Sequence, residues 1–376
     1  MTESRRHSNL ETGRRIVVKI GSSLLVDESN GTVHRQWLES LAADLAVCHS
    51  RGQEIVIVSS GAIAVGRRHL NLPSGELKLD EKQAAAATGM IRLAHAYQET
   101  LSHHEMTVSQ VLLTLDDSEN RRRYINARNT LEALLRLGAV PLINENDTVA
   151  TDEIRLGDND RLAARVAAMI SADIMVLLSD IDGLYSSDPR RNTEAEHISE
   201  VKEITPEIEA MAGEARPGDG TGGMVTKLAA AKTALAAGCS MVIADGKERN
   251  PISRIERGGR CTWFVSSATP RTARKRWIAG SLNPAGAIIV DDGALKALEN
   301  GKSLLPAGVV GIDGEFLRGD AVTVKTREGN EIARGLCAYS SKDARLIMGH
   351  KSSENERLLG YRGRDEIIHR DDLVMT

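Results

Sequence analysis

Short apolar runs alternate with amphipathic stretches over the first two-thirds of the chain. The apolar runs predict buried strands at residues 15–20, 54–58, 108–113, 140–143, 174–178 and 241–244. The stretches with a helical period predict helices at residues 36–49, 62–69, 81–102, 125–137, 159–170 and 224–237. Continuous apolar strands that alternate with helices are typical of a parallel sheet covered on both faces. The pattern therefore predicts an α/β domain over residues 1–262, a three-layer αβα sandwich with a mainly parallel sheet, in which residues 1–12 are disordered.

The pattern changes near residue 254. Residues 254–276 hold seven basic side chains against one acidic one, which indicates a linker, or a strand followed by a linker. The linker is placed at residues 263–283. Beyond it, β-like runs broken by glycine occur at residues 287–290, 309–312, 321–326 and 331–339, with one helical stretch at 293–299. This second part predicts a small β-rich barrel over residues 284–363, followed by a tail at 364–376.

The composition mainly excludes classes of protein and of site. Hydrophobic residues make up 41% and charged residues 27%, as in ordinary globular proteins, and aromatic residues only 3%, so the core is expected to be aliphatic. There is no apolar run of the ~18–20 residues that a membrane helix needs and no secretory signal, so we expect a soluble, cytoplasmic protein. The net charge of −4 provides no global basic field for nucleic acid, and the four widely spaced cysteines do not match a zinc site.

Residues 218–223 match the pattern GxGxxG, but they follow a predicted helix and turn instead of a strand, which disfavours a dinucleotide site. Gly301-Lys302-Ser303 lacks the upstream glycine of a P-loop. The segment Thr221–Lys227 fits a different phosphate clamp: Gly222 and Gly223 allow close approach of backbone N–H groups, a helix begins there, and Lys227 adds a charge. The alternative is a surface loop with a solvated lysine.

A second segment of the same kind, a lysine followed by close backbone donors, lies at the end of the first strand: Lys19, Gly21 and Ser22. A buried lysine is costly there unless its charge is used. The alternative is a lysine that reaches solvent from the sheet edge. Residues 144–147 and 157–160 are dense in carboxylates and amides, which turns and helix caps also favour. Two such clusters near two lysines indicate a site that orients ammonium groups and holds a metal–phosphate complex.

Taken together, these segments resemble the amino-acid kinase family. The resemblance rests on Lys19-x-Gly21-Ser22, Ser59-Ser60-Gly61-Ala62, Asn144-Glu145-Asn146-Asp147, Gly157-Asp158-Asn159-Asp160, Asp188-Pro189-Arg190 and Gly222-Gly223-Met224-x-Thr226-Lys227. Within the family, the chain is most similar to the branch that phosphorylates the side-chain carboxylate of L-glutamate with ATP, the first step of proline biosynthesis. Residues 284–363, with Ser303-Leu304-Leu305-Pro306-x-Gly308 and Arg318-Gly319-Asp320, resemble a PUA domain.

The resemblance implies a role for each matching residue. The catalytic residues would be Lys19 and Lys227, which stabilise charge on the transferring phosphoryl group, and Asp160, which holds both lysines. The implied glutamate-binding residues are Ser60, Gly61, Asp147 and Asn159. The implied ATP-binding residues are Lys19, Gly21, Ser22, Ser179, Asp180, Thr221, Gly222, Gly223, Met224, Val225, Thr226 and Lys227. Ser59 and Ser179 stand where many relatives carry threonine, but both keep the hydroxyl.

The family also implies Mg²⁺ that arrives with ATP, with no protein side chain as a direct metal ligand. It implies feedback inhibition by proline, assembly as a homodimer or homotetramer, and contact with the next enzyme of the pathway. From residue 281 onward thirteen basic and fifteen acidic residues give a local charge of −2, a poor footprint for RNA, so a regulatory or structural role of the PUA domain is favoured.

Two other functions stay open. One is a kinase of the same family that acts on a different carboxylate, a carbamate or a nucleoside monophosphate. The other is an RNA-binding module with an inactive kinase body, which the presence of Lys19, Asp160 and Lys227 argues against.

Overall fold

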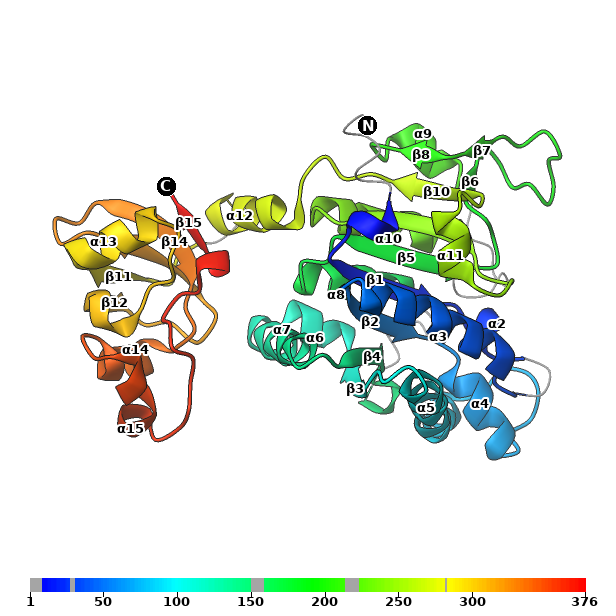
Figure 1. Ribbon diagram of the computed structural model, residues 1–376, viewed down its shortest axis with the longest axis horizontal. Coiled ribbons are helices and arrows are strands. Elements are labelled where there is room, and N and C mark those ends of the chain that lie inside the picture. The colour runs from blue at the N-terminus through cyan, green and yellow to red at the C-terminus, as the bar shows by residue number, and fades with distance from the viewer. Residues whose placement is uncertain (1–8, 28–30, 150–158, 214–222, 281–282) are drawn as a thin grey trace. The chain divides into compact units, whose positions relative to one another are not determined.

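The computed structural model describes residues 9–27, 31–149, 159–213, 223–280 and 283–376. Its contacts divide the chain into two compact units (Figure 1). The larger unit comprises Met1–Glu119 and Asn126–Pro270, and the smaller comprises Asn120–Ile125 and Arg271–Thr376.

An eight-stranded sheet forms the centre of the larger unit, in the order β3-β4-β2-β1-β5-β9-β10-β8. Its first six strands are parallel, β10 runs antiparallel to β9, and β8 runs parallel to β10. The strands are β1 (Arg15–Ile20), β2 (Glu54–Ser59), β3 (Val108–Leu113), β4 (Val140–Glu145), β5 (Ile174–Ser179), β8 (Glu200–Val201), β9 (Ser240–Asp245) and β10 (Cys261–Phe264). The prediction of a mainly parallel αβα fold is confirmed.

Helices cover this sheet in the described part of the larger unit. They are α2 (Ser22–Leu25), α3 (Arg35–Ser50), α4 (Ala62–His69), α5 (Leu79–Ser102), α6 (Leu115–Glu119), α7 (Arg121–Arg136, which begins among the residues grouped with the smaller unit), α8 (Asn159–Met169), α9 (Pro206–Ala210), α10 (Met224–Ala236) and α11 (Pro251–Glu256). The long helices fall within two residues of their predicted ends, except that α7 begins four residues earlier. The four-residue α2 and the hairpin β6 (Leu184–Tyr185) with β7 (His197–Ile198) were too short to give a periodic signal.

Alternation along β1 sets the direction of its functional side chain. Ile16, Val18 and Ile20 belong to the core cluster that includes Trp37 of α3 and Tyr97 of α5. Because successive side chains of a strand point to opposite faces, Lys19 lies on the other face. Helix α8 packs on β1 there, so the sheet pleat directs Lys19 toward α8.

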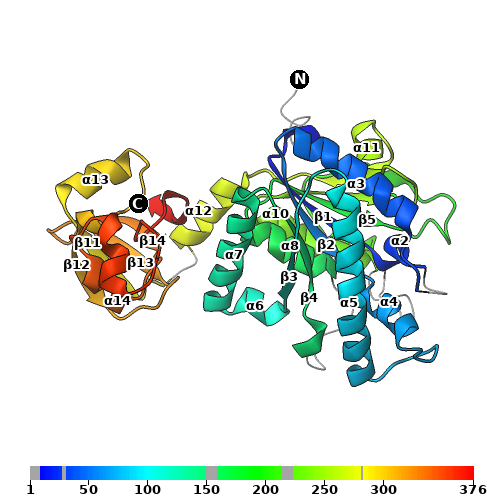
Figure 2. The same cartoon turned by 60° about the horizontal axis from the view of Figure 1, so that its bottom comes forward.

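Helices α4 and α5 lie side by side (Figure 2). Their backbones are in contact at one glycine on each helix. A Cβ atom added to Gly66 would lie 1.7 Å from the carbonyl oxygen of Ala85, and one added to Gly89 would lie 1.8 Å from that of Ala62. Neither position accepts a side chain unless the helices separate. This contact holds the first turn of α4, which follows directly on the end of β2.

Gly89→Ala is expected to lower the free energy of unfolding by about 1–3 kcal/mol or more, because the added methyl group forces α4 and α5 apart. Ala87→Ser, at an exposed position of the same helix, is the matched control and should change stability by less than about 0.5 kcal/mol. Urea denaturation of both variants measures the difference. Equal stability of the two variants would contradict the close contact.

The smaller unit contains a five-stranded sheet in the order β12-β11-β13-β14-β15. Its elements are β11 (Gly286–Val290), α13 (Asp292–Glu299), β12 (Val309–Gly314), β13 (Ala321–Lys325), β14 (Glu331–Leu336), α14 (Ser341–Ile347), α15 (Asn355–Leu359) and β15 (Leu373–Met375). Its own apolar cluster includes Ile288, Phe316 and Val324. The expected β-rich second domain with one helix near 293–299 is confirmed.

Three segments expected to be irregular have regular structure. Helix α12 (Pro270–Gly280) lies within the predicted linker, and β15 lies in the predicted tail. Arg274 of α12 forms a buried ion pair with Asp372, which ties these two segments together. Of the residues expected to be disordered, 1–8 lie outside the described residues, but Leu10–Thr12 form a 3-10 turn in which Leu10 is buried. Single ion pairs and one-residue anchors leave no periodic trace in a sequence.

Candidate active site

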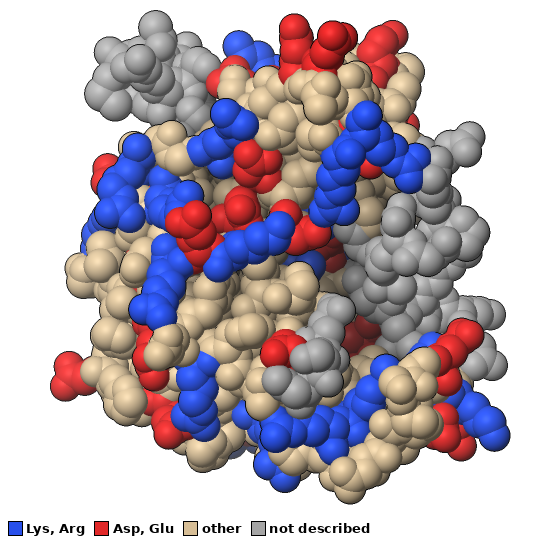
Figure 3. All heavy atoms as spheres, turned by 90° about the vertical axis from the view of Figure 1, so that its right-hand side faces the viewer, with Lys and Arg blue, Asp and Glu red and all other residues tan. Residues whose placement is uncertain are grey.

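Four of the predicted clusters lie at the carboxyl ends of neighbouring strands. They follow β4 (Asn144–Asp147), β2 (Ser59–Gly61), β1 (Lys19–Ser22) and β5 (Ser179–Asp180), which are adjacent in the sheet. In open α/β sheets this edge is where ligands bind. Figure 3 looks onto this side of the larger unit and shows acidic and basic side chains beside one another, not a patch of a single sign.

A buried cluster of opposite charges lies at the centre of this edge. Asp160, at the start of α8, places Oδ1 2.6 Å from Lys19 Nζ and Oδ2 3.1 Å from Lys227 Nζ. The Thr226 hydroxyl lies 3.2 Å from the same Oδ2 and 2.8 Å from the Gly223 carbonyl oxygen, and its one proton is shared between these two acceptors. The three charged residues are 7% (Lys19), 1% (Asp160) and 5% (Lys227) exposed. The predicted catalytic residues therefore come together from one strand and the first turns of two helices.

The two ammonium groups control the ionisation of Asp160. Burial alone would raise the pKa of its carboxyl group, but the charges of Lys19 and Lys227 and their hydrogen bonds outweigh burial and hold that pKa below its usual value. The cluster thus carries two positive charges against one negative charge. The net charge of this cluster is +1, and because its three residues are buried, water screens that charge weakly.

Asn159 connects α8 with the end of β2. Its side-chain amide donates to Ser60 Oγ at 2.7 Å and to the Ser59 carbonyl oxygen at 3.2 Å. Its own amide oxygen is buried and accepts no hydrogen bond from the described residues. A buried acceptor without a donor is costly, so a ligand N–H or O–H group, or a water molecule, fits this position.

Asp147 begins a short 3-10 turn just after β4 and is 9% exposed. Burial raises the pKa of its carboxyl group to about 6. No charged side chain of the described residues forms an ion pair with it. Asp147 is therefore a buried acid at the same sheet edge that would be stabilised as an anion by an incoming cation.

Two glycines of the predicted site, Gly61 and Gly21, differ in their backbone conformation. Gly61 has a φ of 99°, in the left-handed region, and a Cβ there would lie 2.9 Å from Val26 Cγ2. Gly21 is extended, and its N–H already donates to the Leu178 carbonyl oxygen at 3.3 Å. Within the described residues, the first free backbone donor of this turn is instead the N–H of Ser22, at the start of α2.

Of the residues named in the sequence analysis, Thr221 and Gly222 before α10, and Gly157 and Asp158 before α8, lie outside the described residues. Gly223 caps the helix, and Met224 and Val225 form its first turn. Ser179 and Asp180 end β5, and Ser179 Oγ donates to Asp180 Oδ1 at 3.1 Å. Burial of the Asp180 carboxyl is outweighed by hydrogen bonds from Arg190, at 2.9 Å, and Ser179, which lower its pKa.

Comparison with known protein families bears directly on this arrangement. Residues 14–245 match the amino acid kinase family, and residues 286–359 match the PUA domain. The chain belongs to the amino acid kinase family. The first match spans the whole parallel part of the larger sheet and every predicted site residue, and the second lies inside the smaller unit.

Relatives in this family cover almost the entire chain. The glutamate 5-kinase of Paramagnetospirillum magneticum is 64% identical over 368 residues, which are 98% of this chain and 99% of that protein. The glutamate 5-kinase of Rhodospirillum rubrum is 59% identical over 359 residues, 96% of each chain. That of Agrobacterium fabrum is 59% identical over 367 residues, 98% of this chain and 94% of its own. The resemblance to a kinase followed by a PUA domain is confirmed.

Several residues of this amino acid kinase site carried no sequence signal. Tyr97 is fully buried in α5, and its hydroxyl lies 3.1 Å from Ser59 Oγ. Burial raises the pKa of Tyr97, so this hydroxyl stays protonated and can donate. Trp37 and Lys247, described below, also reach this edge from outside the motifs. Each is a single residue within an ordinary helix or loop, so only the three-dimensional arrangement identifies it.

Two absences concern only the described part of the chain. No helix there is long and apolar enough to cross a bilayer. No three His, Cys, Asp or Glu side chains there gather into a metal-binding group.

Proposed function

We propose that this chain transfers the γ-phosphoryl group of ATP to the side-chain carboxylate of L-glutamate, forming L-glutamyl 5-phosphate and ADP in the first step of proline biosynthesis. The observation that carries the proposal is the 64% identity to a glutamate 5-kinase over 98% of this chain. The buried Lys19–Asp160–Lys227 cluster at the ligand-binding edge of the sheet supports the same chemistry.

The reaction requires that the two substrates are positioned and that the negative charge of the phosphates is neutralised. A carboxylate oxygen of glutamate forms the new bond to the γ-phosphorus, and the bond from that phosphorus to the β–γ bridging oxygen breaks, so ADP leaves with its electron pair. The attacking group is already an anion, so no general base has to remove a proton. Negative charge moves across the phosphoryl oxygens, and fixed cations stabilise it.

Lys19 and Lys227 are the proposed cations, and Asp160 keeps them in place. Because Asp160 holds an oxygen toward each lysine, the two ammonium groups stay fixed without a substrate. Preorganised charges cost no reorganisation during the reaction. The N–H groups at the start of α2 and α10 add donors for phosphate oxygens.

The proposed glutamate site lies toward β2 and β4. Ser60 and Gly61 would bind the carboxylates, and Asp147 and the amide oxygen of Asn159 would bind the α-ammonium group. The Asp147 carboxyl has no ion-pair partner and the Asn159 amide oxygen has no donor among the described residues. A zwitterionic amino acid would complement both groups. The proposed nucleotide site uses Ser179, Asp180 and the segment Thr221–Lys227.

We propose that Mg²⁺ enters with the nucleotide and supplies charge neutralisation on its phosphates. The carboxylates of Asp160 and Asp180 at this edge are already paired with lysine or arginine, which suits a metal held by phosphate and water. Proline inhibition, assembly into dimers or tetramers, contact with the next enzyme and a cytoplasmic location remain proposals from the family resemblance, as do the domain limits at residues 262, 283 and 363.

A panel of acceptors tests the substrate. ADP release from Mg-ATP should occur with L-glutamate at a rate far above that with aspartate, N-acetylglutamate or UMP. Turnover with another acceptor but not with glutamate would keep the family and overturn the substrate. Absence of turnover with every acceptor, together with salt-dependent binding of RNA, would favour the binding-module alternative.

Asp147 gives a pH test of the proposed ammonium contact. Because its pKa is about 6, KM for glutamate should rise as the pH falls below 6, where the carboxyl becomes neutral. Asp147→Asn should raise that KM at least about tenfold at pH 8, since a charge-assisted hydrogen bond is lost. Steady-state kinetics across pH 5–8 measures both.

Asp147→Asn is expected to weaken glutamate binding but to raise the stability of the protein. A folded pKa raised above the unfolded value stabilises the protein at low pH, and this contribution is lost as the pH rises through about 6. Asp147→Asn removes the charged form, so its Tm at pH 8 should exceed that of the wild type, and the gap should close near pH 4. Asp313→Asn, at an exposed position of β12, is the control. A lower Tm together with an unchanged KM would contradict the assignment.

A further inference from the structure

The corner between β9 and α11, residues 245–247, touches the site without belonging to any of the motifs. The N–H of Gly246 donates to the carbonyl oxygen of Ser179 at 2.8 Å. The carbonyl oxygen of Gly246 accepts from the indole N–H of Trp37 at 2.6 Å, and this contact is buried. One glycine therefore links the end of β5 to helix α3.

The corner is also packed without free space. A Cβ atom at Gly246 would lie 2.5 Å from Leu24 Cδ1 and 3.0 Å from Leu178 Cβ. Leu24 belongs to α2, the helix that follows the Lys19 strand, and Leu178 precedes Ser179. The corner is thus wedged between the turn after β1 and the end of β5, so its position is determined by both.

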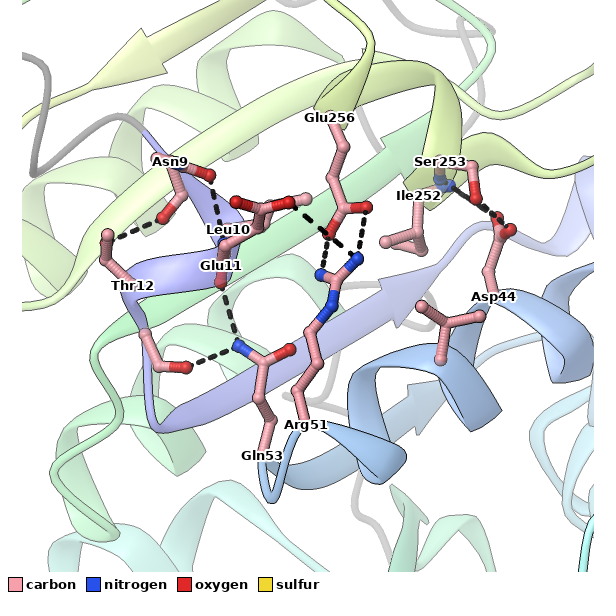
Figure 4. A network of polar contacts seen from close by, with 12 residues as sticks. Asn9, Leu10, Glu11, Thr12, Asp44, Arg51, Gln53, Ile252, Ser253 and Glu256 are labelled. Carbon is pink, nitrogen blue, oxygen red and sulfur yellow. Dashed lines mark hydrogen bonds and ion pairs between the residues drawn. The ribbon is translucent and has the colours of Figure 1, made fainter.

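Helix α11 behind the corner is fixed to α3 at two points (Figure 4). Asp44 accepts the backbone N–H groups of Ile252 and Ser253 at 2.9 and 3.2 Å, which caps the start of α11. At the other end, Arg51 and Glu256 form two hydrogen bonds of 2.6 and 3.1 Å. Asp44 is only 3% exposed, so its cap is shielded from water. These contacts make the corner a rigid support.

This support presents Lys247 at the ligand-binding edge. The ammonium group of Lys247 donates to the main-chain oxygen of Asp180 at 2.8 Å. A lysine has three N–H donors, and the other two have no partner among the described residues. The carboxylate of Asp180 is paired with Arg190 instead, so it does not neutralise Lys247.

The charge of the site favours a further cation. Lys19, Lys227 and Asp160 together carry +1, whereas a nucleoside di- or triphosphate brings several negative charges. Lysine is a common phosphate-binding residue and acts there as a compact point charge.

We propose that Lys247 is a further nucleotide-binding residue whose ammonium group contacts a phosphate of the bound nucleotide, and that Trp37 and Gly246 are the positioning residues that hold it there. This rests on the proposed placement of the nucleotide at Ser179 and Asp180. Lys247 would contribute equally to the binding of ADP and of ATP. The lysines assigned to the transferred phosphoryl group are Lys19 and Lys227, not Lys247.

Equilibrium binding of ADP and of adenosine to the full chain, measured without glutamate, tests the proposal. Lys247→Ala should raise the Kd for ADP about tenfold and leave the Kd for adenosine unchanged, because only a phosphate contact is lost. Lys247→Arg should recover most of the ADP affinity. Lys202→Ala, at an exposed lysine paired with Glu200, is the control and should change neither Kd.

Two other outcomes overturn the proposal at different levels. If Lys247→Ala weakens adenosine as much as ADP, the residue does not contact phosphate. If Ser179→Ala weakens ADP binding and Lys247→Ala does not, the nucleotide placement holds and the role of Lys247 is wrong. If neither variant changes ADP binding, the nucleotide placement itself is wrong.

Trp37→Phe tests the positioning role, because phenylalanine keeps most of the bulk and removes the indole N–H. KM for ATP should rise about three- to tenfold, in keeping with one lost hydrogen bond, while KM for glutamate stays constant. Trp263→Phe, at a buried tryptophan of β10, controls for loss of packing. A parallel rise of both KM values, or none, would contradict positioning of the nucleotide end.

Discussion

Lys227→Ala is expected to lower kcat by at least about 100-fold, the cost of removing one preorganised charge from a phosphoryl-transfer transition state. Lys227 is 5% exposed and its ammonium group is held 3.1 Å from Asp160 Oδ2, so water cannot replace it without entering the cluster. The effect should fall on kcat more than on KM for glutamate, because the charge on the transferring group develops mainly in the transition state.

The same helix provides a matched control. Lys232 lies five residues further along α10, is half-exposed and pairs with Glu209. Lys232→Ala should leave kcat within about twofold of the wild type, since exposed ion pairs contribute little. Near-normal kcat of a folded Lys227→Ala variant would remove this lysine from the mechanism.

Asp160→Asn is expected to cost both stability and activity. It removes the carboxylate that contacts both buried lysines, Lys19 and Lys227, and breaking a buried ion pair in this way typically costs about 3–5 kcal/mol. We expect kcat to fall at least about 100-fold as the two ammonium groups separate. Chemical denaturation and steady-state kinetics on the same preparation measure the two effects.

The pH dependence of this variant has a definite sign. The pKa of Asp160 is depressed in the folded state, so its contribution is present above the unfolded pKa, ordinarily about 3.9, and is lost as the pH falls through the folded value. The stability gap between wild type and Asp160→Asn should therefore be large at pH 7 and shrink below about pH 4.

A double-mutant cycle provides the decisive control for the cluster. Adding Lys227→Met to Asp160→Asn removes one of the two charges that Asp160 pairs with in the wild type, so the double variant should be more stable than the two single losses predict. Strictly additive losses would show that Asp160 does not hold Lys227 in solution.

The sequence predicted the parallel sheet well because its strands are continuous apolar runs separated by long periodic helices. It also placed Lys19 near the end of a strand, where a buried charge is costly unless it is used, and left open a lysine that reaches solvent from the sheet edge. The clusters that contain Asp147 and Asp160 indicated a site that orients ammonium groups, but the role of each residue came from the resemblance, since such carboxylates are as typical of turns and helix caps as of a site.

The remaining features depend on distances that no local pattern encodes. Gly66 and Gly89 are ordinary small residues of two helices until the helices come into contact. In the sequence, Trp37 is indistinguishable from the other core residues of α3. Its indole N–H contacts Gly246, which lies 209 residues further along the chain. Strand β15 is three residues long and is held by its neighbours in space. Such long-range contacts are fixed by tertiary packing, not by composition or period.

Trapping of the product with hydroxylamine tests the central claim most directly. The wild-type chain, supplied with Mg-ATP and L-glutamate, should form the 5-hydroxamate of glutamate in a one-to-one ratio with ADP, and Lys227→Ala should form it at least about 100-fold more slowly. This result would establish both the acceptor and the acyl-phosphate product. Release of ADP without hydroxamate, or hydroxamate formed only from another acid, would contradict phosphorylation of the glutamate side chain.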